Sequence, residues 1–581
     1  MNVYRRLKQL LTRKQKRSVI LLCILIFFSA LLETLGVSII IPLISAVVSP
    51  ETILENHYVK LLFAVLGIGT VERDGFVRLL LVAAMAVFVV KNLYMLVLYD
   101  AQARFATKLE SGTCVRLLSD YLNRPYSFYL NADVNAIFQT INKDIPHVCE
   151  LLQEVMKLLT EIAVSICLCL LLLVVDFKMT MSIAALMLVM LLFIVFVLKP
   201  RLGRLGKELV KQQVGTMKWM QQSVFGIKDV KVAAKEGFFL KAFSEAYTSL
   251  AGVTRKYSVY NNAPRLVIEM VCIVGLLAYM LFTVLHGGDL NAMLPQLTAF
   301  GLAAVRLMPS VNRISTHLST IAYYEPSLNY VCDNINVAGL QETKEVQQGA
   351  RMHLKDEIRL EGICFRYPNS EKDIFHGADM RIAIGESVGV IGASGAGKTT
   401  VIDILLGLLT PQAGKILADG REIQGSDPAW LSDIGYIAQN IYMLDTTIRA
   451  NVAFGVRPEE MDEVRIWEVL REAQMEEFVR SLPEGLDTEI GDRGVRLSGG
   501  QRQRIGIARA LYHDPELLVF DEATSALDND TEAAIMEAIN ALKGHKTMVI
   551  IAHRLKTIEN CDRLYKVENG NILPATLEES A

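Results

Sequence analysis

The sequence has few cysteines, and their spacing suits neither a metal site nor a set of disulfides. Nine cysteines are scattered over 581 residues, without a C-x-x-C pair and without histidines close by. Two of them, Cys167 and Cys169, stand inside an apolar helical segment, where a small apolar side chain packs well. We therefore expect neither a zinc site nor a disulfide framework.

The sequence also lacks a large net charge. Lys and Arg number 59 and Asp and Glu number 62, so the formal net charge is only −3 at pH 7. This balance argues against nucleic acid as the main partner, since such proteins usually carry excess positive charge. The charge is unevenly distributed, however, because the first seventeen residues hold seven Lys or Arg residues and no acid. They predict a basic, amphipathic helix over 1–17 on the inner membrane surface, with the N-terminus in the cytoplasm.

Long apolar runs are what the sequence has in excess. Hydrophobic residues make up 52% of the chain, and six apolar segments are each long enough to cross a bilayer as a helix. The first run is too long for a signal peptide and lacks a cleavage site, so we interpret it as a retained span. The six predicted spans cover about residues 18–48, 76–123, 145–175, 179–198, 266–285 and 290–307.

The connections between these spans differ on the two sides of the membrane. The outer turns at 175–178 and 285–289 are short, whereas the inner connections at about 100–145 and 199–262 are long and charged. This difference predicts helices that continue beyond the membrane into the cytoplasm. Two breaks in the inner connections, at 124–129 and 226–229, predict short transverse helices that touch a cytoplasmic domain; solvated turns are the alternative.

A change in composition divides the chain into two domains. Residues 335–350 are polar and predict a linker between an all-α, six-helix transmembrane domain at 1–334 and a second domain at 351–581. In the second domain, strand-like apolar runs alternate with helical segments, which is typical of an α/β nucleotide-binding fold. The fold class predicted is therefore a multidomain membrane protein with a C-terminal α/β domain.

The clearest motif of the second domain is a phosphate loop. Residues 392–400 read G-A-S-G-A-G-K-T-T and fit G-x-x-x-x-G-K-[ST] between a strand and a helix. In such a loop the backbone N–H groups surround the phosphates, while Lys398 would bridge phosphate oxygens and Thr399 would hold Mg²⁺. An ordinary glycine-rich turn is the alternative. The candidate ATP-binding residues here are Gly392, Ser394, Gly395, Ala396, Gly397, Lys398, Thr399 and Thr400.

Two further stretches supply the chemistry that an ATPase needs. The apolar run at 517–520 ends in Asp521 and Glu522; the first can complete the Mg²⁺ shell and the second can polarise the attacking water. A second anion site is predicted where a serine and two glycines begin a helix. Because one nucleotide has no use for two such sites, we expect the second to serve the ATP of another subunit in a dimer. Its residues are Ser498, Gly499, Gly500 and Gln501.

These motifs together resemble an ATP-binding cassette (ABC) domain. The phosphate loop, L-S-G-G-Q at 497–501, F-D-E-A-T-S-A-L-D at 520–528 and I-A-H-R at 551–554 stand in the family's order. With six spans ahead, the chain is similar to an exporter half-transporter. The resemblance implies ATP and Mg²⁺ as cofactors and a second half-transporter, with intact sites favouring a second copy. It also implies an inner-membrane location with the ATPase domain in the cytoplasm.

The resemblance assigns roles to single residues as well. It implies that Tyr367 stacks on adenine, that Gln439 contacts Mg²⁺ and water, and that His553 holds the γ-phosphate, which makes Glu522, His553 and Gln439 the catalytic set. Residues 525–528 would cross to the partner. The segment 488–494 would contact the transverse helices, with Asp492 where glutamate is usual. A packed aromatic and a satisfied polar residue are the alternatives for Tyr367 and His553.

Charged residues inside the predicted spans suggest what is transported, since such groups are costly in a bilayer and usually face a cavity or a partner. At 1.5 Å per residue, Lys91 and Arg306 lie roughly 24 Å from the outer surface, with Arg265 slightly deeper. Such a belt of cations would suit an anionic head group, above all a phosphate. Snorkelling to the inner interface is the alternative. Glu33 has no evident partner in the sequence. The candidate substrate residues are Lys91, Arg265, Arg306 and Arg313.

A narrower resemblance bears on the substrate. Several segments resemble the PglK-type lipid-linked oligosaccharide flippases of bacterial protein glycosylation, namely 33–34 followed by Ile-Pro at 41–42, 263–265, 306–314 and 561–565. This implies that ATP drives the flipping of a polyprenyl-pyrophosphate glycan, an anionic glycolipid, with the cations on the pyrophosphate. Lys91 stands where arginine is expected. An exporter of other lipids, peptides or amphipathic drugs is the alternative, and an ATP-gated regulatory subunit is another.

Overall fold

The computed structural model describes two parts of the chain separately. It covers residues 2–38, 73–175, 181, 189, 192–285, 290–335 and 351–576, the last with gaps at 369, 426, 523–528 and 553. The chain forms two compact units. A helical unit comprises Met1–Asn123 and Asp133–Gln341, and a nucleotide unit comprises Arg124–Ala132 and Glu342–Ala581.

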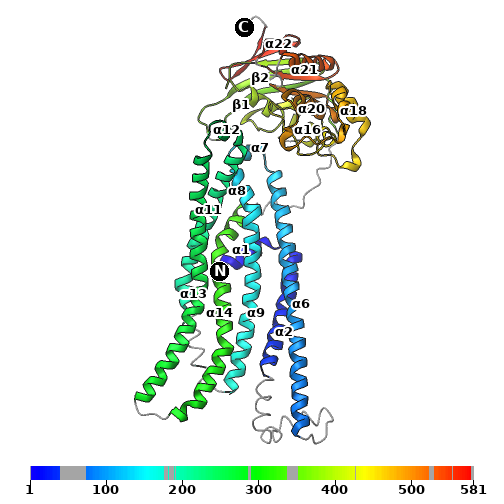
Figure 1. Ribbon diagram of the computed structural model, residues 1–581. Coiled ribbons are helices and arrows are strands. Elements are labelled where there is room, and N and C mark those ends of the chain that lie inside the picture. Colours follow the sequence, from blue (N-terminus) through cyan, green and yellow to red (C-terminus); the bar gives the residue numbers. More distant parts are fainter. Residues whose placement is uncertain are drawn as a thin grey trace. The chain divides into compact units, whose positions relative to one another are not determined.

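The helical unit consists of long helices that pack side by side (Figure 1). Helix α9 packs against α2, α6 and α14, and α11 packs against α13 and α14. Its described elements are α1 (Asn2–Leu10), α2 (Arg13–Ser38), α6 (Arg73–Leu122), α8 (Val134–Gln139), η1 (Thr140–Asp144), α9 (Ile145–Val175), η2 (Ile194–Leu198), α11 (Lys199–Phe225), α12 (Ile227–Val232), α13 (Glu236–Leu285) and α14 (Leu290–Asn334).

Long helices occupy the inner connections, and their extension beyond the membrane stays a prediction. Helix α6 runs without a break to Leu122, and α11 and α13 fill most of the inner connection at 199–262. Both predicted breaks exist, as α7 (Tyr126–Tyr129) and α12. The end of the first predicted span, nearly all of the outer connection predicted at 49–74, and most of the fourth predicted span lie outside the described residues.

The prediction of one helix over residues 1–17 is wrong at its C-terminal end. Helix α1 ends at Leu10 and α2 begins at Arg13. The break is caused by Thr12, whose hydroxyl accepts the Gln15 backbone N–H at 3.3 Å while Gln15 Oε1 accepts the Thr12 N–H at 2.8 Å. This reciprocal pair is a capping box, which starts a new helix.

The surface of α6 is what a lipid-facing helix requires. Among the described residues, Arg13–Gly36 and Leu81–Leu122 are long and apolar enough to cross a membrane. On α6 the side chains of Val82, Met85, Val89 and Leu93 follow one another at three- and four-residue steps, and all are more than half exposed. A stripe of this kind is unfavourable in water but favourable in hydrocarbon.

The nucleotide unit contains two sheets. The smaller sheet is antiparallel with strand order β2-β1-β4-β5, and the larger has the order β10-β9-β3-β8-β7-β6, parallel from β9 to β6. Strands β3, β7 and β8 are buried along their whole length and form the core. The strands are β1 (Glu357–Phe365), β2 (Phe375–Ala383), β3 (Ser387–Ile391), β4 (Ala413–Ala418), β5 (Arg421–Ile423), β6 (Ile434–Ile437), β7 (Leu517–Asp521), β8 (Thr547–Ile551), β9 (Arg563–Glu568) and β10 (Asn571–Ala575).

Helices cover these sheets, as expected for an α/β fold. Helix α15 packs in the same apolar cluster as the inner faces of β1 and β3, and the fully buried Trp430 donates its indole N–H to the Leu405 carbonyl at 2.9 Å. The helices are α15 (Lys398–Leu405), α16 (Pro428–Leu431), α17 (Ile448–Val452), α18 (Glu463–Glu472), α19 (Glu476–Ser481), α20 (Gly499–Tyr512), α21 (Asn529–Leu542) and α22 (Leu555–Ile558).

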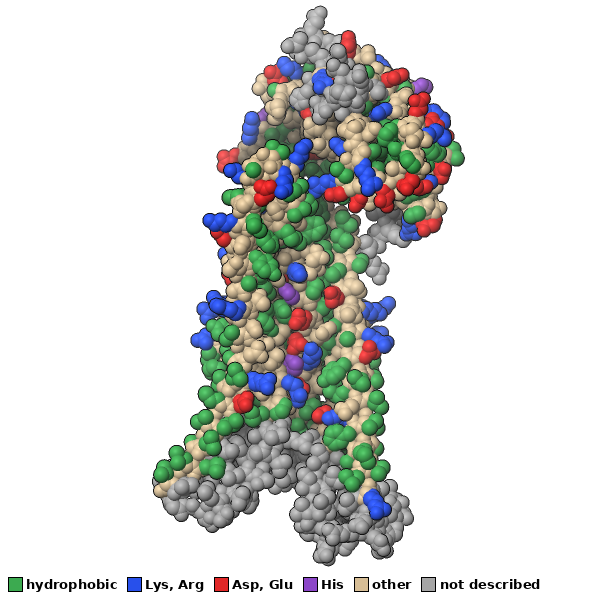
Figure 2. Space-filling view, viewed as in Figure 1, with side chains coloured by type: hydrophobic (Ala, Val, Ile, Leu, Met, Phe, Trp, Pro, Cys, Tyr) green, Lys and Arg blue, Asp and Glu red, His purple; other side chains and the backbone are tan. Residues whose placement is uncertain are grey.

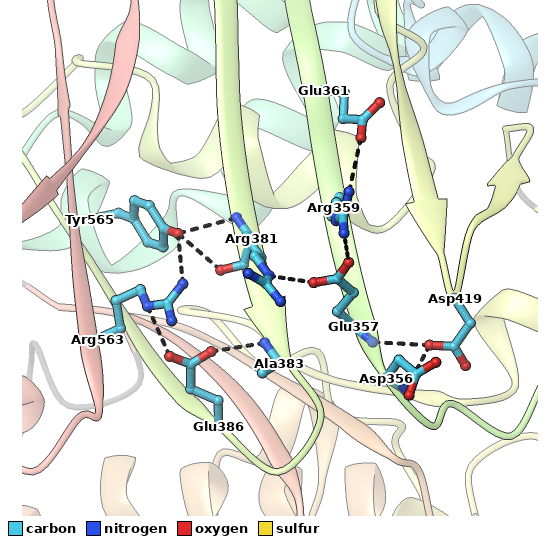
Figure 3. A network of polar contacts seen from close by, with 10 residues as sticks. All are labelled: Asp356, Glu357, Arg359, Glu361, Arg381, Ala383, Glu386, Asp419, Arg563 and Tyr565. Atoms are coloured by element: carbon cyan, nitrogen blue, oxygen red, sulfur yellow. Dashed lines mark hydrogen bonds and ion pairs between the residues drawn. The ribbon is translucent and has the colours of Figure 1, made fainter.

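One hydroxyl group joins the two sheets (Figure 3). Tyr565 of β9 is 5% exposed, and its hydroxyl donates to the Arg381 carbonyl of β2 at 3.0 Å. The same oxygen accepts the Arg381 backbone N–H at 3.2 Å and a guanidinium N–H of Arg563 at 3.4 Å. The Tyr565 ring thus packs in the core, while its hydroxyl bonds to the backbone N–H and carbonyl of Arg381 in the neighbouring sheet.

We expect Tyr565→Phe to lower the free energy of unfolding of the nucleotide unit by about 1 kcal/mol, because it removes the hydroxyl that bonds to the partly buried backbone N–H and carbonyl of Arg381. Thermal unfolding of the full chain in detergent measures the loss. Tyr442→Phe is the matched control, since Tyr442 is 66% exposed. Equal melting temperatures for the two variants would contradict the role of the Tyr565 hydroxyl.

Candidate active site

The predicted ATP-site segments lie at one edge of the larger sheet. The phosphate loop follows β3, Gln439 follows β6, and Asp521 is the last residue of β7. Because β3, β6 and β7 belong to the parallel part of the sheet, their carboxyl ends share one edge. This is where open α/β sheets bind ligands.

The glycines of the phosphate loop are required by close packing and by backbone conformation. Gly392 and Gly397 have φ of 152° and 112°, outside the usual range of residues with side chains. A Cβ on Gly392 would lie 2.6 Å from the Val567 carbonyl oxygen, and one on Gly397 would lie 2.8 Å from Ile374 Cγ2. Gly397 precedes α15 and gives it no side-chain cap, so the first N–H groups of α15 remain suited to an anion.

Lys398 is buried against the loop that precedes it. Its Nζ donates to the carbonyls of Gly392 at 2.9 Å and Ala393 at 3.1 Å. Burial lowers the pKa of Lys398, while the carboxylates of Glu522 and Asp521 act in the opposite direction. The ammonium group is therefore held by neutral oxygens, which a phosphate with full negative charge would outcompete.

The two carboxylates after β7 have different surroundings. Asp521 is 6% exposed, and burial raises its pKa, with the charge of Glu522 adding to the effect. Glu522 has a left-handed backbone with φ of 49°, and its Oε2 accepts the Gln439 amide N–H at 2.7 Å. The fold thus joins two of the three predicted catalytic residues, Gln439 and Glu522, and buries the neighbouring Asp521.

Oxygen donors at this edge suit Mg²⁺. Thr399 is exposed at the start of α15 and Asp521 ends β7, so a hydroxyl and a carboxylate are available. Among the described residues, no three His, Cys, Asp or Glu side chains form a cluster that could hold a metal. Mg²⁺ usually takes one or two protein ligands together with phosphate oxygens and water, and Thr399 and Asp521 would be those ligands.

Tyr367 is packed in this structure. Its hydroxyl is 3.0 Å from Thr400 Oγ1, and its ring makes an edge-to-face contact with Phe365 at 5.1 Å between centroids. The contact with Thr400 places the tyrosine beside the phosphate loop. Stacking of Tyr367 on adenine stays a prediction.

Ser498 and Gln501 form a helix cap. Ser498 Oγ accepts the Gln501 N–H at 3.2 Å, and Gln501 Oε1 accepts the Ser498 N–H at 2.8 Å. Ser498 and Gly499 are exposed at the start of α20. The cap explains the serine and glutamine within one chain, and the use of this helix end by a second subunit's nucleotide stays a prediction. His553 and residues 525–528 lie outside the described residues.

A polar group beside Asp521 was not predicted from the sequence. Asp403, on α15, is half-buried; burial raises its pKa to about 6, and the charge of Asp521 adds to this. Tyr436 of β6 places its hydroxyl 3.5 Å from Asp521 Oδ2. The transverse helix α7 contributes Tyr126, whose pKa is raised by burial and by the charge of Asp403. The only signal in the sequence was an aspartate within the apolar run at 401–406.

Two of the four candidate substrate cations have partners that the sequence did not reveal. Lys91 Nζ lies 3.0 Å from Glu33 Oε1, and Arg313 Nε lies 2.7 Å from Glu161 Oε1. Glu33 therefore has a partner, contrary to the expectation from the sequence, because α2 and α6 pack together and bring it to Lys91. Arg265 is exposed on α13, and the Arg306 side chain lies outside the described residues.

Comparison with known proteins places both units in one group. Residues 375–525 match the family model described as ABC transporter, and residues 19–293 match the model of the ABC transporter transmembrane region. The ATP-dependent lipid A-core flippase of Cupriavidus metallidurans is 29% identical over 464 residues, which cover 79% of this chain and 77% of that protein. The heterocyst differentiation ATP-binding protein HepA of a Nostoc species is 34% identical over 60% of this chain and 56% of that protein.

A solved structure supports the fold over nearly the full length. A bacterial Atm1-family ABC exporter with ATP bound aligns with a TM-score of 0.74 at 22% identity, covering 96% of this chain and 94% of the other. At this identity the likeness concerns the fold, a helical transmembrane domain followed by an ATPase domain.

Proposed function

This chain belongs to the ABC transporter family, which couples ATP hydrolysis to transport across a membrane, and we propose that it flips a lipid-linked oligosaccharide across the cytoplasmic membrane. The substrate would be a polyprenyl-pyrophosphate glycan or a similar anionic glycolipid. The working unit would be a dimer of two copies, with the N-termini and the ATPase domains in the cytoplasm.

The main support for a glycolipid substrate is that several relatives have the same name, ATP-dependent lipid A-core flippase. Flippases named for lipid A-core, from Cupriavidus metallidurans and Ralstonia nicotianae, align with 79% of this chain at 29% and 28% identity. Lipid A-core is the substrate in their names, and an anionic glycolipid is the class we carry over. The basic side chains inside the helical unit support this choice, because a charged head group needs polar partners on its way through a bilayer.

The ATP site would work through residues that the fold already brings together. The phosphate loop and Lys398 would bind the phosphates, and Thr399 and Asp521 would hold Mg²⁺, which would neutralise phosphate charge. Glu522 would accept a proton from the attacking water, while Gln439 would keep its carboxylate oriented through the bond that already joins them. His553 would hold the γ-phosphate.

Closure of the dimer would transmit this chemistry to the membrane. Each ATP would lie between one phosphate loop and the Ser498 segment of the other copy. ATP can drive closure only by binding the closed state more tightly than the open one. Hydrolysis would then remove that preference and reset the transporter, and the transverse helix α7 would carry the change toward the helical unit.

We expect an undecaprenyl-pyrophosphate glycan to raise the ATP turnover of the purified protein in lipid vesicles severalfold, because substrate binding should favour the closed dimer. Parallel vesicles would contain lipid A, a hydrophobic peptide or an amphipathic drug. We expect Arg306→Ala to lose the stimulation by the glycan, and Arg104→Ala, whose side chain is 80% exposed on α6, to keep it.

Each outcome of this experiment selects a substrate class. Stimulation by lipid A alone would keep the flippase and change the head group. Stimulation by peptides or drugs alone would contradict the glycolipid and favour the general exporter. An ion flux without matching ATP turnover would instead favour a regulatory subunit.

A further inference from the structure

Polar side chains pair along the contact between α9 and α14. Ser327 donates to Asp144 Oδ1 at 2.8 Å, just before α9 begins. Further along, His317 bonds to Glu154, and Arg313 pairs with Glu161 at 2.7 Å. The residue numbers rise on α9 as they fall on α14, so the two helices run antiparallel and the three pairs form a row along their contact. Figure 2 shows charged and histidine side chains along this face of the helical unit.

The acids and bases of this row differ in exposure. The side chains of Glu154 and Glu161 are only 12% and 15% exposed. Those of Arg313 and Lys157 are 54% and 40% exposed, although each is paired with one of these carboxylates. The carboxylates therefore lie deep between the helices, and the basic groups lie over them on the accessible side.

The spacing on α9 places the basic group between the two acids. Lys157 follows Glu154 by three residues and precedes Glu161 by four, so all three share one helix face. Lys157 Nζ lies 2.7 Å from Glu154 Oε1, and the other oxygen of Glu154 bonds to His317 Nδ1. Arg313 and His317 are likewise four residues apart and share one face of α14. This face packs against the face of α9 that carries Glu154 and Glu161.

This layering is suited to an anion. A long basic side chain normally loses rotational freedom when it binds a ligand, and a fixed partner removes part of that cost in advance. Arg313 commits its Nε to Glu161, and its guanidinium carries four further N–H donors on the two terminal nitrogens. An ammonium and a guanidinium at neighbouring levels of one face match an anion with several oxygens, such as a phosphate ester.

We propose that Lys157 belongs, with Arg313, to the site that binds the phosphate groups of the transported lipid, and that Glu154 and Glu161 are positioning residues that hold the two cations toward it. This inference rests on the proposed flippase function. The inference adds Lys157 to the residues that bind the head group. It also explains the two buried carboxylates, which by themselves would repel an anion: each holds a basic side chain in place between itself and the anion.

A purely structural row of pairs is the competing explanation, and exchanging the partners distinguishes the two. Lys157→Glu combined with Glu154→Lys keeps a pair between these two positions and puts the carboxylate in the accessible position, although it removes the bond from Glu154 to His317. Arg313→Glu combined with Glu161→Arg likewise keeps a pair and puts the carboxylate in the accessible position, on α14. Asp100→Arg combined with Arg104→Asp is the matched control, because that pair is exposed on α6 and belongs to no site.

The readout is the concentration of undecaprenyl-pyrophosphate glycan that gives half-maximal stimulation of ATP turnover, relative to each variant's own turnover without lipid. We expect this concentration to rise about tenfold or more in both exchanged pairs, as for the loss of one charged contact, and to stay unchanged in the control. Thermal unfolding checks that the exchanged pairs fold. Folded variants that keep the wild-type concentration would overturn the site and leave a structural row.

A second measurement tests the anion site even if no glycolipid stimulates the wild type. Lys157 is exposed enough to react with an amine-acylating reagent, and we expect inorganic pyrophosphate to slow that reaction, followed by mass spectrometry. Lys231, paired with Glu236 and 64% exposed, should react at the same rate with and without pyrophosphate. Protection of Lys157 without lipid stimulation would retain the site and remove the proposed substrate. Absence of protection would overturn the site.

Discussion

Replacing Glu522 with glutamine is expected to lower ATP turnover by about 100-fold or more, the usual contribution of a general base. Glutamine keeps the shape of the side chain, and its amide oxygen can still accept the Gln439 N–H that Glu522 accepts at 2.7 Å. The left-handed backbone at this position is unaffected as well, so the change removes only the proton acceptor. ATP should therefore still bind, and the dimer should accumulate in its closed, ATP-loaded form.

Two measurements on the same sample check this prediction. Phosphate release gives the turnover, and retention of labelled ATP through gel filtration reports the trapped state. Glu484→Gln is the matched control, because Glu484 is exposed in a turn of the same unit. Turnover at the wild-type rate in Glu522→Gln would remove Glu522 from the catalytic set and undermine the assignment of the whole strand end.

The second large effect is expected at Lys398. Replacing it with alanine should weaken ATP binding by about 10- to 100-fold, the range that corresponds to the loss of a charged hydrogen bond. The loop should keep its form, because Gly392 and Gly397 pack so closely that an added Cβ would lie 2.6 Å from the Val567 carbonyl oxygen or 2.8 Å from Ile374 Cγ2, and this packing does not involve the Lys398 side chain. The loss should therefore appear in affinity rather than in folding.

Equilibrium binding of a fluorescent ATP analogue measures the affinity of Lys398→Ala. The rise in melting temperature on adding ATP gives an independent reading, since a ligand that binds only the folded state stabilises it by mass action. Lys372→Ala, at an exposed position of the same unit, is the control. An unchanged affinity in Lys398→Ala would contradict binding of the phosphates by this loop.

Sequence motifs predicted the separate segments of the ATP site but not the contacts between them. Local sequence predicted the loop, the strand that ends in Asp521 and the cap at Ser498, because each depends on neighbouring residues and on the period of a strand or helix. It did not predict that Gln439 and Glu522 bond to each other, or that Asp403 approaches Asp521. Those contacts follow from the strand order of the sheet, which brings together residues that are far apart in the chain.

In the helical unit, the sequence did not predict which charged side chains pair between helices. Depth counted along each helix grouped Lys91, Arg265 and Arg306 at one level, but depth says nothing about how a helix is rotated. The structure pairs Lys91 with Glu33 and Arg313 with Glu161, and it brings Lys157 and His317 to the same face. Rotation and register are set by packing along the whole helix, so a few charged residues cannot reveal them.

The sequence by itself determined the two-domain order, the long helices, the ATPase motifs and the family, because periodicity and short motifs encode them locally. Even the break after Leu10, which was missed, was encoded locally by Thr12 and Gln15. Only the tertiary structure decided which acid lies behind which base and which carboxylates share an edge of the sheet. Such pairs depend on contacts between distant segments, and the free energy of those contacts is set by burial and packing that no single segment contains.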